Sequence, residues 1–227
     1  MENSTEHNRK QLYKQQSELR EIMMNSNRYN DAMDLFYKQH AQLHSGNVTQ
    51  NKFWSFADAV LGDLPEEKFR QIQKNNNHSI AWCIWHIARI EDATMNLLVA
   101  EEPQVIRQNN WLEKMNVNVE NTGNGMSDVE IKQLSSKINS EALLAYRVVV
   151  GQKTREIVGS LTAEKITQKV EKERIENLLS EDVLLEDATG LANYWGNRSI
   201  AGLLLMPATR HNLSHLNEVM RLRKKHR

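Results

Sequence analysis

The stretch HSIAWCIWHIARIED, residues 78–92, decides the fold, because apolar side chains surround it on every side of a helix over residues 80–90. A helix that is apolar all round is buried at the centre of a domain rather than lying on its surface. Ser79 is placed to cap its first turn, and Pro103 is placed to end it. The stretch therefore predicts a central, buried helix over residues 79–100.

The rest of the chain has the composition of a helical protein. It contains 3 prolines and 9 glycines in 227 residues, and helices need few of either. Apolar residues recur at helical rather than alternating spacing. We therefore expect an all-α fold, a single domain over residues 1–227 that forms a four-helix bundle with short extra helices in the connections. The four main helices are expected at residues 9–44, 79–100, 140–161 and 199–224.

The connecting segments carry further signals. Residues 51–61 predict a short helix, and the motif SDVE that begins at Ser127 has the pattern of a capping box. Residues 164–185 are charged and predict a surface helix, whereas residues 193–198 predict a loop rich in polar and aromatic groups. Pro207 lies inside the last predicted helix and should kink or interrupt it.

The charge balance argues against several classes of partner. Lys plus Arg and Asp plus Glu both total 29, so no net field attracts nucleic acid or an anionic membrane. The N-terminus lacks the apolar core of a signal peptide, and no apolar run has the length of a membrane span. Cys83 is the single cysteine, which rules out an internal disulfide and suits the cytoplasm. We therefore expect a cytoplasmic protein with neither nucleic acid nor a membrane as partner.

Three histidines stand out as candidate metal ligands. His86 lies in the middle of the buried helix, where an imidazole needs a hydrogen-bond partner or a metal ion. His211 and His215 are four residues apart, so they share one face of a helix and can reach the same ion. On spacing alone, a core histidine bonded to a neighbouring side chain is an equal alternative for His86.

The segments SIAWCIWHIARIED and MPATRHNLSHLNEV together resemble the DinB/YfiT-like family of metalloenzymes. Members of that family form a four-helix bundle in which one histidine of the second core helix and a His-x-x-x-His pair of the last one hold a divalent metal ion. The resemblance covers most of the chain and implies that His86, His211 and His215 are the ligands. Family members also often pair, so the resemblance implies a homodimer.

Other residues are candidates for the pocket or for the surroundings of the ligands. His40 and His44 are also four residues apart, at the end of the first predicted helix. Either the helix dipole favours them there, or they face the pocket and supply an extra ligand. Glu218 is either a surface carboxylate or the acceptor of a hydrogen bond from a ligating imidazole. Cys83 is interpreted as a small buried thiol rather than as a zinc ligand.

Two residues near the start of the last predicted helix are candidates for the entrance of a pocket. Trp195 and Arg198 are expected near one end of the bundle. There they either pack onto the helices or line the way in for a substrate.

A site of three histidines leaves coordination positions of Zn²⁺ or Ni²⁺ open, as in catalytic rather than closed structural sites. Such an ion can activate water for hydrolysis, or a low-molecular-weight thiol for transfer to a small electrophile. The resemblance favours the thiol, because family members include metal-dependent thiol transferases and isomerases. The alternative is a non-catalytic metal-binding bundle with a structural or stress-response role.

Overall fold

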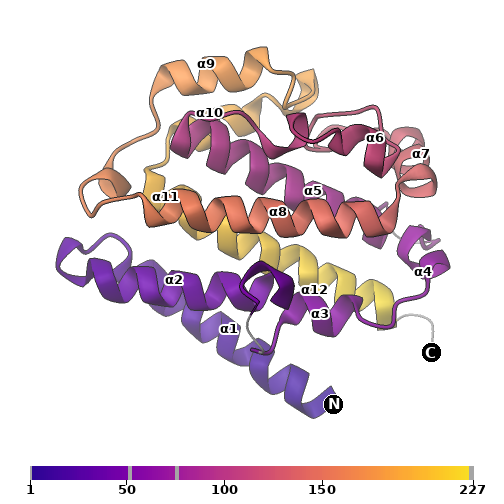
Figure 1. The fold of residues 1–227 in the computed structure, drawn as a ribbon, viewed down its shortest axis with the longest axis horizontal. Coiled ribbons are helices and arrows are strands. Elements are labelled where there is room, and N and C mark those ends of the chain that lie inside the picture. Colours follow the sequence, from indigo (N-terminus) through magenta and orange to yellow (C-terminus); the bar gives the residue numbers. More distant parts are fainter. Residues whose placement is uncertain (1, 51–52, 75–76, 225–227) are drawn as a thin grey trace.

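A computed structural model describes residues 2–50, 53–74 and 77–224 of the chain (Figure 1). Within these ranges the protein is all-α, as predicted, and its only β-type pairing is an isolated bridge between Lys169 and Ser199. None of the described helices combines the length and the apolar character needed to cross a membrane.

The helices alternate with short 3-10 and π-helical turns. The α-helices are α1 Glu2–Ile22, α2 Tyr29–Leu43, α3 Phe56–Leu61, α4 Glu66–Arg70, α5 Ile80–Ala93, α6 Trp111–Met115, α7 Asp128–Lys137, α8 Ser140–Gly159, α9 Lys172–Ser180, α10 Gly190–Gly196, α11 Ile200–Leu205 and α12 His211–Lys224. The 3-10 turns are Ser26–Arg28, Gly46–Val48, Val105–Arg107, Lys165–Thr167 and Glu186–Ala188. Two π-helical turns, Thr94–Ala100 and Met206–Arg210, extend α5 and join α11 to α12.

Helix α5 lies at the centre of the molecule, as its sequence predicts. All of its residues are buried, and it packs against both α8 and α12. Ser79 caps the helix, since its side-chain oxygen accepts a hydrogen bond of 2.9 Å from the backbone amide of Trp82. The central helix therefore carries its side chains into the interfaces with two neighbouring helices.

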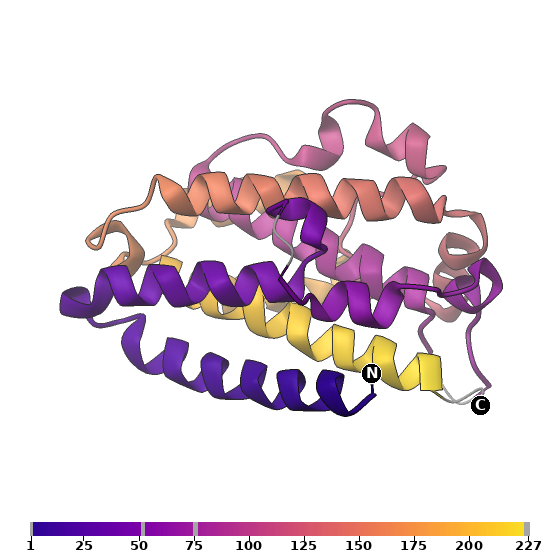
Figure 2. The same cartoon turned by 60° about the horizontal axis from the view of Figure 1, so that its bottom comes forward.

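The single helix predicted over residues 9–44 is wrong, because the chain turns back on itself after α1. Figure 2 shows α1 and α2 side by side, and the two helices pack against each other. The turn contains Asn25 and Asn27, and the Asn25 side chain accepts a hydrogen bond from the Asn27 backbone amide. Asparagine side chains bond to the backbone in this way in turns and so compete with a helix. The four expected main helices thus do not correspond one to one with the observed ones.

The region around residues 164–200 also departs from the prediction. The charged segment contains a 3-10 turn and the short helix α9 instead of one helix over residues 164–185, and α10 covers most of the predicted loop at 193–198. The segment before α9 pairs with the segment after α10. The backbone amide of Val170 donates to the carbonyl of Arg198, and that of Ile200 donates to the carbonyl of Gln168. This backbone pairing takes up the polar groups that a continuous helix would use, and it fixes α9 and α10 next to each other.

Other boundaries agree with the sequence. Helix α8 occupies the segment predicted at residues 140–161, and Ser127 forms a complete capping box at the start of α7. Of the helix predicted at residues 51–61, residues 51 and 52 lie outside the described ranges, and residues 53–55 are not helical, so α3 begins at Phe56. Pro207 interrupts the last predicted helix, which becomes α11, a π-helical turn and α12.

Candidate metal centre

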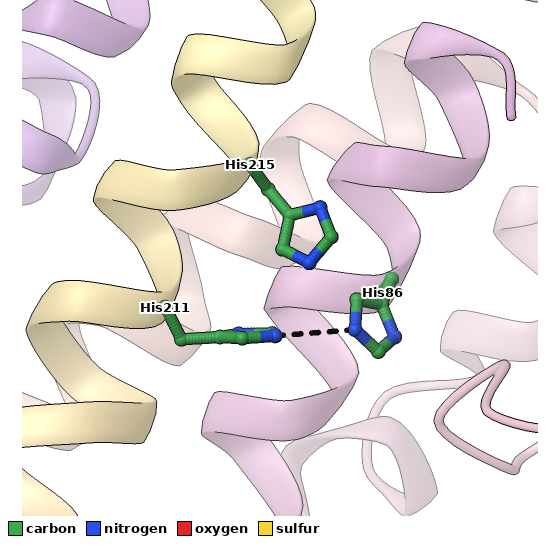
Figure 3. A group of neighbouring side chains, drawn as sticks. All are labelled: His86, His211 and His215. Carbon is green, nitrogen blue, oxygen red and sulfur yellow. Dashed lines mark hydrogen bonds between the residues drawn. The ribbon is translucent and has the colours of Figure 1, made fainter. Parts of the chain in front are cut away.

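The three predicted ligand histidines come together where α5 faces α12. His86 comes from α5, whereas His211 and His215 come from α12, and their rings converge (Figure 3). The candidate ligand nitrogens of the three rings all lie within 4.8 Å of one another. The Nε2 atoms of His86 and His211 are 3.2 Å apart. The fold therefore produces the cluster that the spacing of the pair alone could not guarantee.

Hydrogen bonds on the far side of the rings determine which nitrogen of His86 faces the cluster. His86 Nδ1 lies 2.6 Å from the backbone carbonyl of Thr122, in the loop before α7. A carbonyl can only accept, so Nδ1 carries the hydrogen and donates it. Nε2 is then left without a hydrogen, and its lone pair points at His211. This is the tautomer that a metal ligand needs.

His215 is oriented in a similar way by a carboxylate. Its Nδ1 donates to Glu218 at 2.9 Å, and His78 donates to the other oxygen of Glu218 at 3.1 Å. Partial burial by itself would raise the pKa of Glu218, but the hydrogen bonds from His215 and His78 outweigh it and hold that pKa below its usual range. Glu218 is therefore an ionised acceptor, placed as the sequence suggested for a group that fixes the tautomer of a ligand.

His86 is buried and His211 is partly buried, and the loss of solvation keeps these two imidazoles uncharged. Loss of solvation, reinforced by the neighbouring His215, lowers the pKa of His86 to about 3. Burial, together with His86 and His215, also lowers the pKa of His211 well below its ordinary value. His86 and His211 thus keep lone pairs available at neutral pH without competition from protons.

A cavity of about 80 Å³ opens onto two of the three histidines. It is lined by His86, His211, Ile90, Asn124, Leu191, Tyr194, Trp195, Met206 and Pro207. Apart from the two imidazoles and Asn124, the cavity is walled mainly by apolar and aromatic side chains. Trp195 is buried and forms part of this wall, whereas Arg198 lies over the ring of Tyr194, 4.2 Å from its centroid. Of the two predicted entrance residues, Trp195 lines this cavity, whereas Arg198 does not line it and contacts the Tyr194 ring instead.

Residues 52–218 match the family model of the DinB superfamily. The chain belongs to the DinB superfamily. The matched range contains all three histidines of the cluster, and it excludes α1, α2 and the His40–His44 pair. No curated protein matches the chain.

The second histidine pair of this DinB protein does not reach the three-histidine cluster. His40 and His44 instead face Glu91 of α5, with Nε2-to-carboxylate distances of 3.0 Å each. All three residues are fully or almost fully buried. The pair thus points inward, but the group it meets is a carboxylate rather than the other three histidines.

Cys83 lies in a third group of possible ligands, with His78 and Glu218. Its thiol is buried, and ligand atoms of Cys83, His78 and Glu218 lie within 4.8 Å of one another. Burial, with the nearby Glu218 carboxylate, raises the pKa of Cys83 well above its ordinary value. A thiol that resists deprotonation is a poor metal ligand. This agrees with the interpretation of Cys83 as a small buried side chain.

Sequence reasoning did not single out several residues that the fold places around these clusters. Glu91 had a visible signal, since a carboxylate inside a helix of apolar residues needs a partner. Asn212 donates to Glu91 at 2.8 Å, and His78 contacts Glu218. Neither residue had a visible signal in the sequence, because its partner is more than a hundred residues away in the chain. Thr122 contributes a backbone carbonyl, so the identity of its side chain carries no signal.

Proposed function

We propose that this protein is a metal-dependent enzyme in which His86, His211 and His215 hold one divalent ion, Zn²⁺ or Ni²⁺. Its chemistry acts on a small molecule, either as transfer of a low-molecular-weight thiol or as hydrolysis. One observation carries the proposal. Three imidazoles from two helices converge beside a cavity, and the hydrogen bonds to Thr122 and Glu218 leave the inner nitrogens of two of them free.

The residues present fit an ion. Imidazole nitrogens are common ligands of Zn²⁺ and Ni²⁺, and three of them leave coordination positions open. When bound, the ion supplies a Lewis acid that lowers the pKa of a water molecule or a thiol. Thr122 and Glu218 hold the rings of His86 and His215 in position, so the chain pre-organises the ligands.

The cavity limits what can approach the histidines. Within the described part of the chain, its wall contains no lysine, arginine or carboxylate, and Leu191, Trp195 and Met206 present apolar surface. This lining disfavours bulk water and favours an uncharged reacting group. It therefore supports transfer of a thiol, whose sulfur is weakly hydrated, over hydrolysis.

The alternative is a non-catalytic role in which the ion ties α5 to α12. The small size of the cavity, about 80 Å³, favours it, because a drug-sized ligand needs several times that space. Removal of the ion separates the two functions. A protein with its own apolar core stays folded when a catalytic ion is removed, whereas loss of a structural ion takes much of the folding stability with it.

Metal binding is the first test. Elemental analysis of protein purified without an affinity tag should identify the ion and give its stoichiometry. Calorimetric titration of the metal-free protein should show an affinity that falls at least about tenfold in His86→Ala, His211→Ala or His215→Ala, because two histidines make an incomplete site. The control is His7→Ala in α1, which should bind like the parent. Unchanged affinity in His211→Ala and His215→Ala would contradict the proposal.

A further inference from the structure

The cluster formed by His40, His44 and Glu91, hereafter the His–Glu cluster, has the composition of a metal site of its own. Its two imidazole nitrogens and its carboxylate lie within 4.8 Å of one another. His40 Nε2 is 3.0 Å from Glu91 Oε1, and His44 Nε2 is 3.0 Å from Glu91 Oε2. Each imidazole therefore faces a different oxygen, so that four ligand atoms are available.

These separations suit a single ion. Two ligands at about 2.0–2.1 Å from one ion and at right angles to each other are about 3 Å apart, which is the separation observed here. Two histidines and a carboxylate are a common ligand set for divalent transition metals. With both carboxylate oxygens engaged, the cluster supplies four ligand atoms to one ion.

The charges around Glu91 also favour a metal ion at this cluster. Its neighbour on α5, Asp92, is equally buried and pairs with Arg89 at 2.8 Å. Among the described residues, no lysine or arginine lies within ion-pair distance of Glu91. A buried carboxylate without a charged partner is costly, and binding a metal ion is one of the ways proteins remove that cost.

The surroundings hold the cluster in place. Asn212 donates to Glu91 Oε2, and Arg147 donates to the oxygen of Asn212 at 3.1 Å, which fixes the orientation of the amide. Neither His40 nor His44 has a described partner at Nδ1, so both rings are oriented through Nε2. A cavity of about 420 Å³ has His44 and Arg147 in its wall and so reaches the cluster at His44.

We propose that His40, His44 and Glu91 hold a second divalent metal ion in a closed site that ties α2 to α5. The site is separate from the three-histidine cluster and shares no ligand with it. Two of its ligands precede the region that matches the DinB superfamily. The proposal does not depend on the proposed enzymatic function, because either site can exist without the other.

The test uses the full chain with the first site removed. A His211→Ala and His215→Ala double variant is loaded with Zn²⁺, passed through a desalting column and analysed for metal. We expect one ion per chain, an X-ray absorption spectrum that shows two imidazole ligands, and a melting temperature raised by Zn²⁺. A folded double variant, judged by circular dichroism, that retains no ion would overturn the proposal.

A second comparison assigns the ion to the His–Glu cluster. In the same background, Glu91→Gln keeps the shape of the side chain but removes its charge, and it should abolish retention of the ion. Glu218→Gln is the matched control and should leave retention unchanged. An ion that persists in Glu91→Gln would overturn the assignment. If Glu91→Gln fails to fold, the absorption spectrum of the double variant decides, since a site without two imidazoles contradicts the proposal.

Discussion

Two histidine pairs in this protein have the same spacing and different surroundings. His211 and His215 on α12 meet a third imidazole, His86, next to a cavity with an apolar wall. His40 and His44 on α2 meet Glu91, in a fully buried position that is oriented by Asn212. The first pair thus meets an imidazole beside a cavity that His211 lines, whereas the second faces a negative charge.

The difference shows that the spacing of two histidines determines only that they share one face of a helix. Whether the pair forms an open or a closed site depends on the residue opposite, and here both opposing residues belong to α5. His86 and Glu91 are separated by little more than one helical turn. One buried helix therefore supplies the deciding group to both clusters, from two different faces.

The largest expected effect on stability is that of replacing Glu91, the carboxylate of the His–Glu cluster. Glu91→Ala should lower the free energy of unfolding of the metal-free protein by about 3 kcal/mol or more, because it leaves two imidazoles and one amide buried without their acceptor, at about 1–3 kcal/mol each. Urea denaturation measures this change. Glu156→Ala, on an exposed ion pair of α8, is the control and should cost about 1 kcal/mol or less. A loss of similar size in both variants would show that Glu91 has no special structural role.

Replacing Glu218 should affect metal binding more than stability, the opposite of what we expect for Glu91. Glu218→Gln should weaken metal binding at the three-histidine cluster by about 10–100-fold, because the amide orients His215 less strongly than a carboxylate does. The stability of the metal-free protein should change little, since Glu218 is only partly buried. Calorimetric titration with Zn²⁺ checks the affinity. If the affinity stays at the parent value, the hydrogen bond to His215 is incidental.

A glycine of α8 tests how tightly the His–Glu cluster is packed. A Cβ atom at Gly151 would lie 2.7 Å from His44 Nδ1, so the imidazole would have to move. Gly151→Ala should therefore cost about 1 kcal/mol or more in unfolding free energy. Gly190→Ala in α10 is the matched control, because a Cβ there meets nothing within 4 Å. Equal stability of the two variants would mean that the His44 ring has room to shift.

The smallest effect concerns pH, and both clusters should contribute to it. Burial lowers the pKa of His86 and of His44 to about 3, while both titrate near 6.5 in the unfolded chain. Between these values the unfolded state binds more protons, so stability rises with pH and falls as the pH drops below about 6.5. Each histidine should account for about 1 kcal/mol or less of the loss between pH 7 and pH 6.

Urea denaturation of the metal-free protein at several pH values checks this slope. His86→Gln and His44→Gln should each flatten it by a similar amount. The same low pKa of His86 means that its proton competes with a metal ion only in more acidic solution than the ordinary pKa of histidine would suggest. A slope identical to that of the parent in both variants would show that the two imidazoles are not buried as uncharged groups.

The sequence predicted the central helix and the three converging histidines for reasons that survive in the structure. His86 was recognisable because it is a polar residue in a helix of apolar ones. The break between α1 and α2 was missed because the apolar spacing continues through it, although Asn25 and Asn27 carried a local signal. The contacts of Thr122 and Asn212 depend on where distant segments meet, and no pattern within either segment encodes that.

The π-helical turn Met206–Arg210 immediately precedes His211. Such a turn accommodates about one extra residue compared with an α-helix, and each residue turns a helix by about 100°. Loss of a single codon here, for example that of Pro207, would let α11 continue into α12 as a regular helix and swing both histidines away from His86. The gene would still encode all three histidines. An alignment that scores the histidines alone would therefore count the shortened protein as metal-binding.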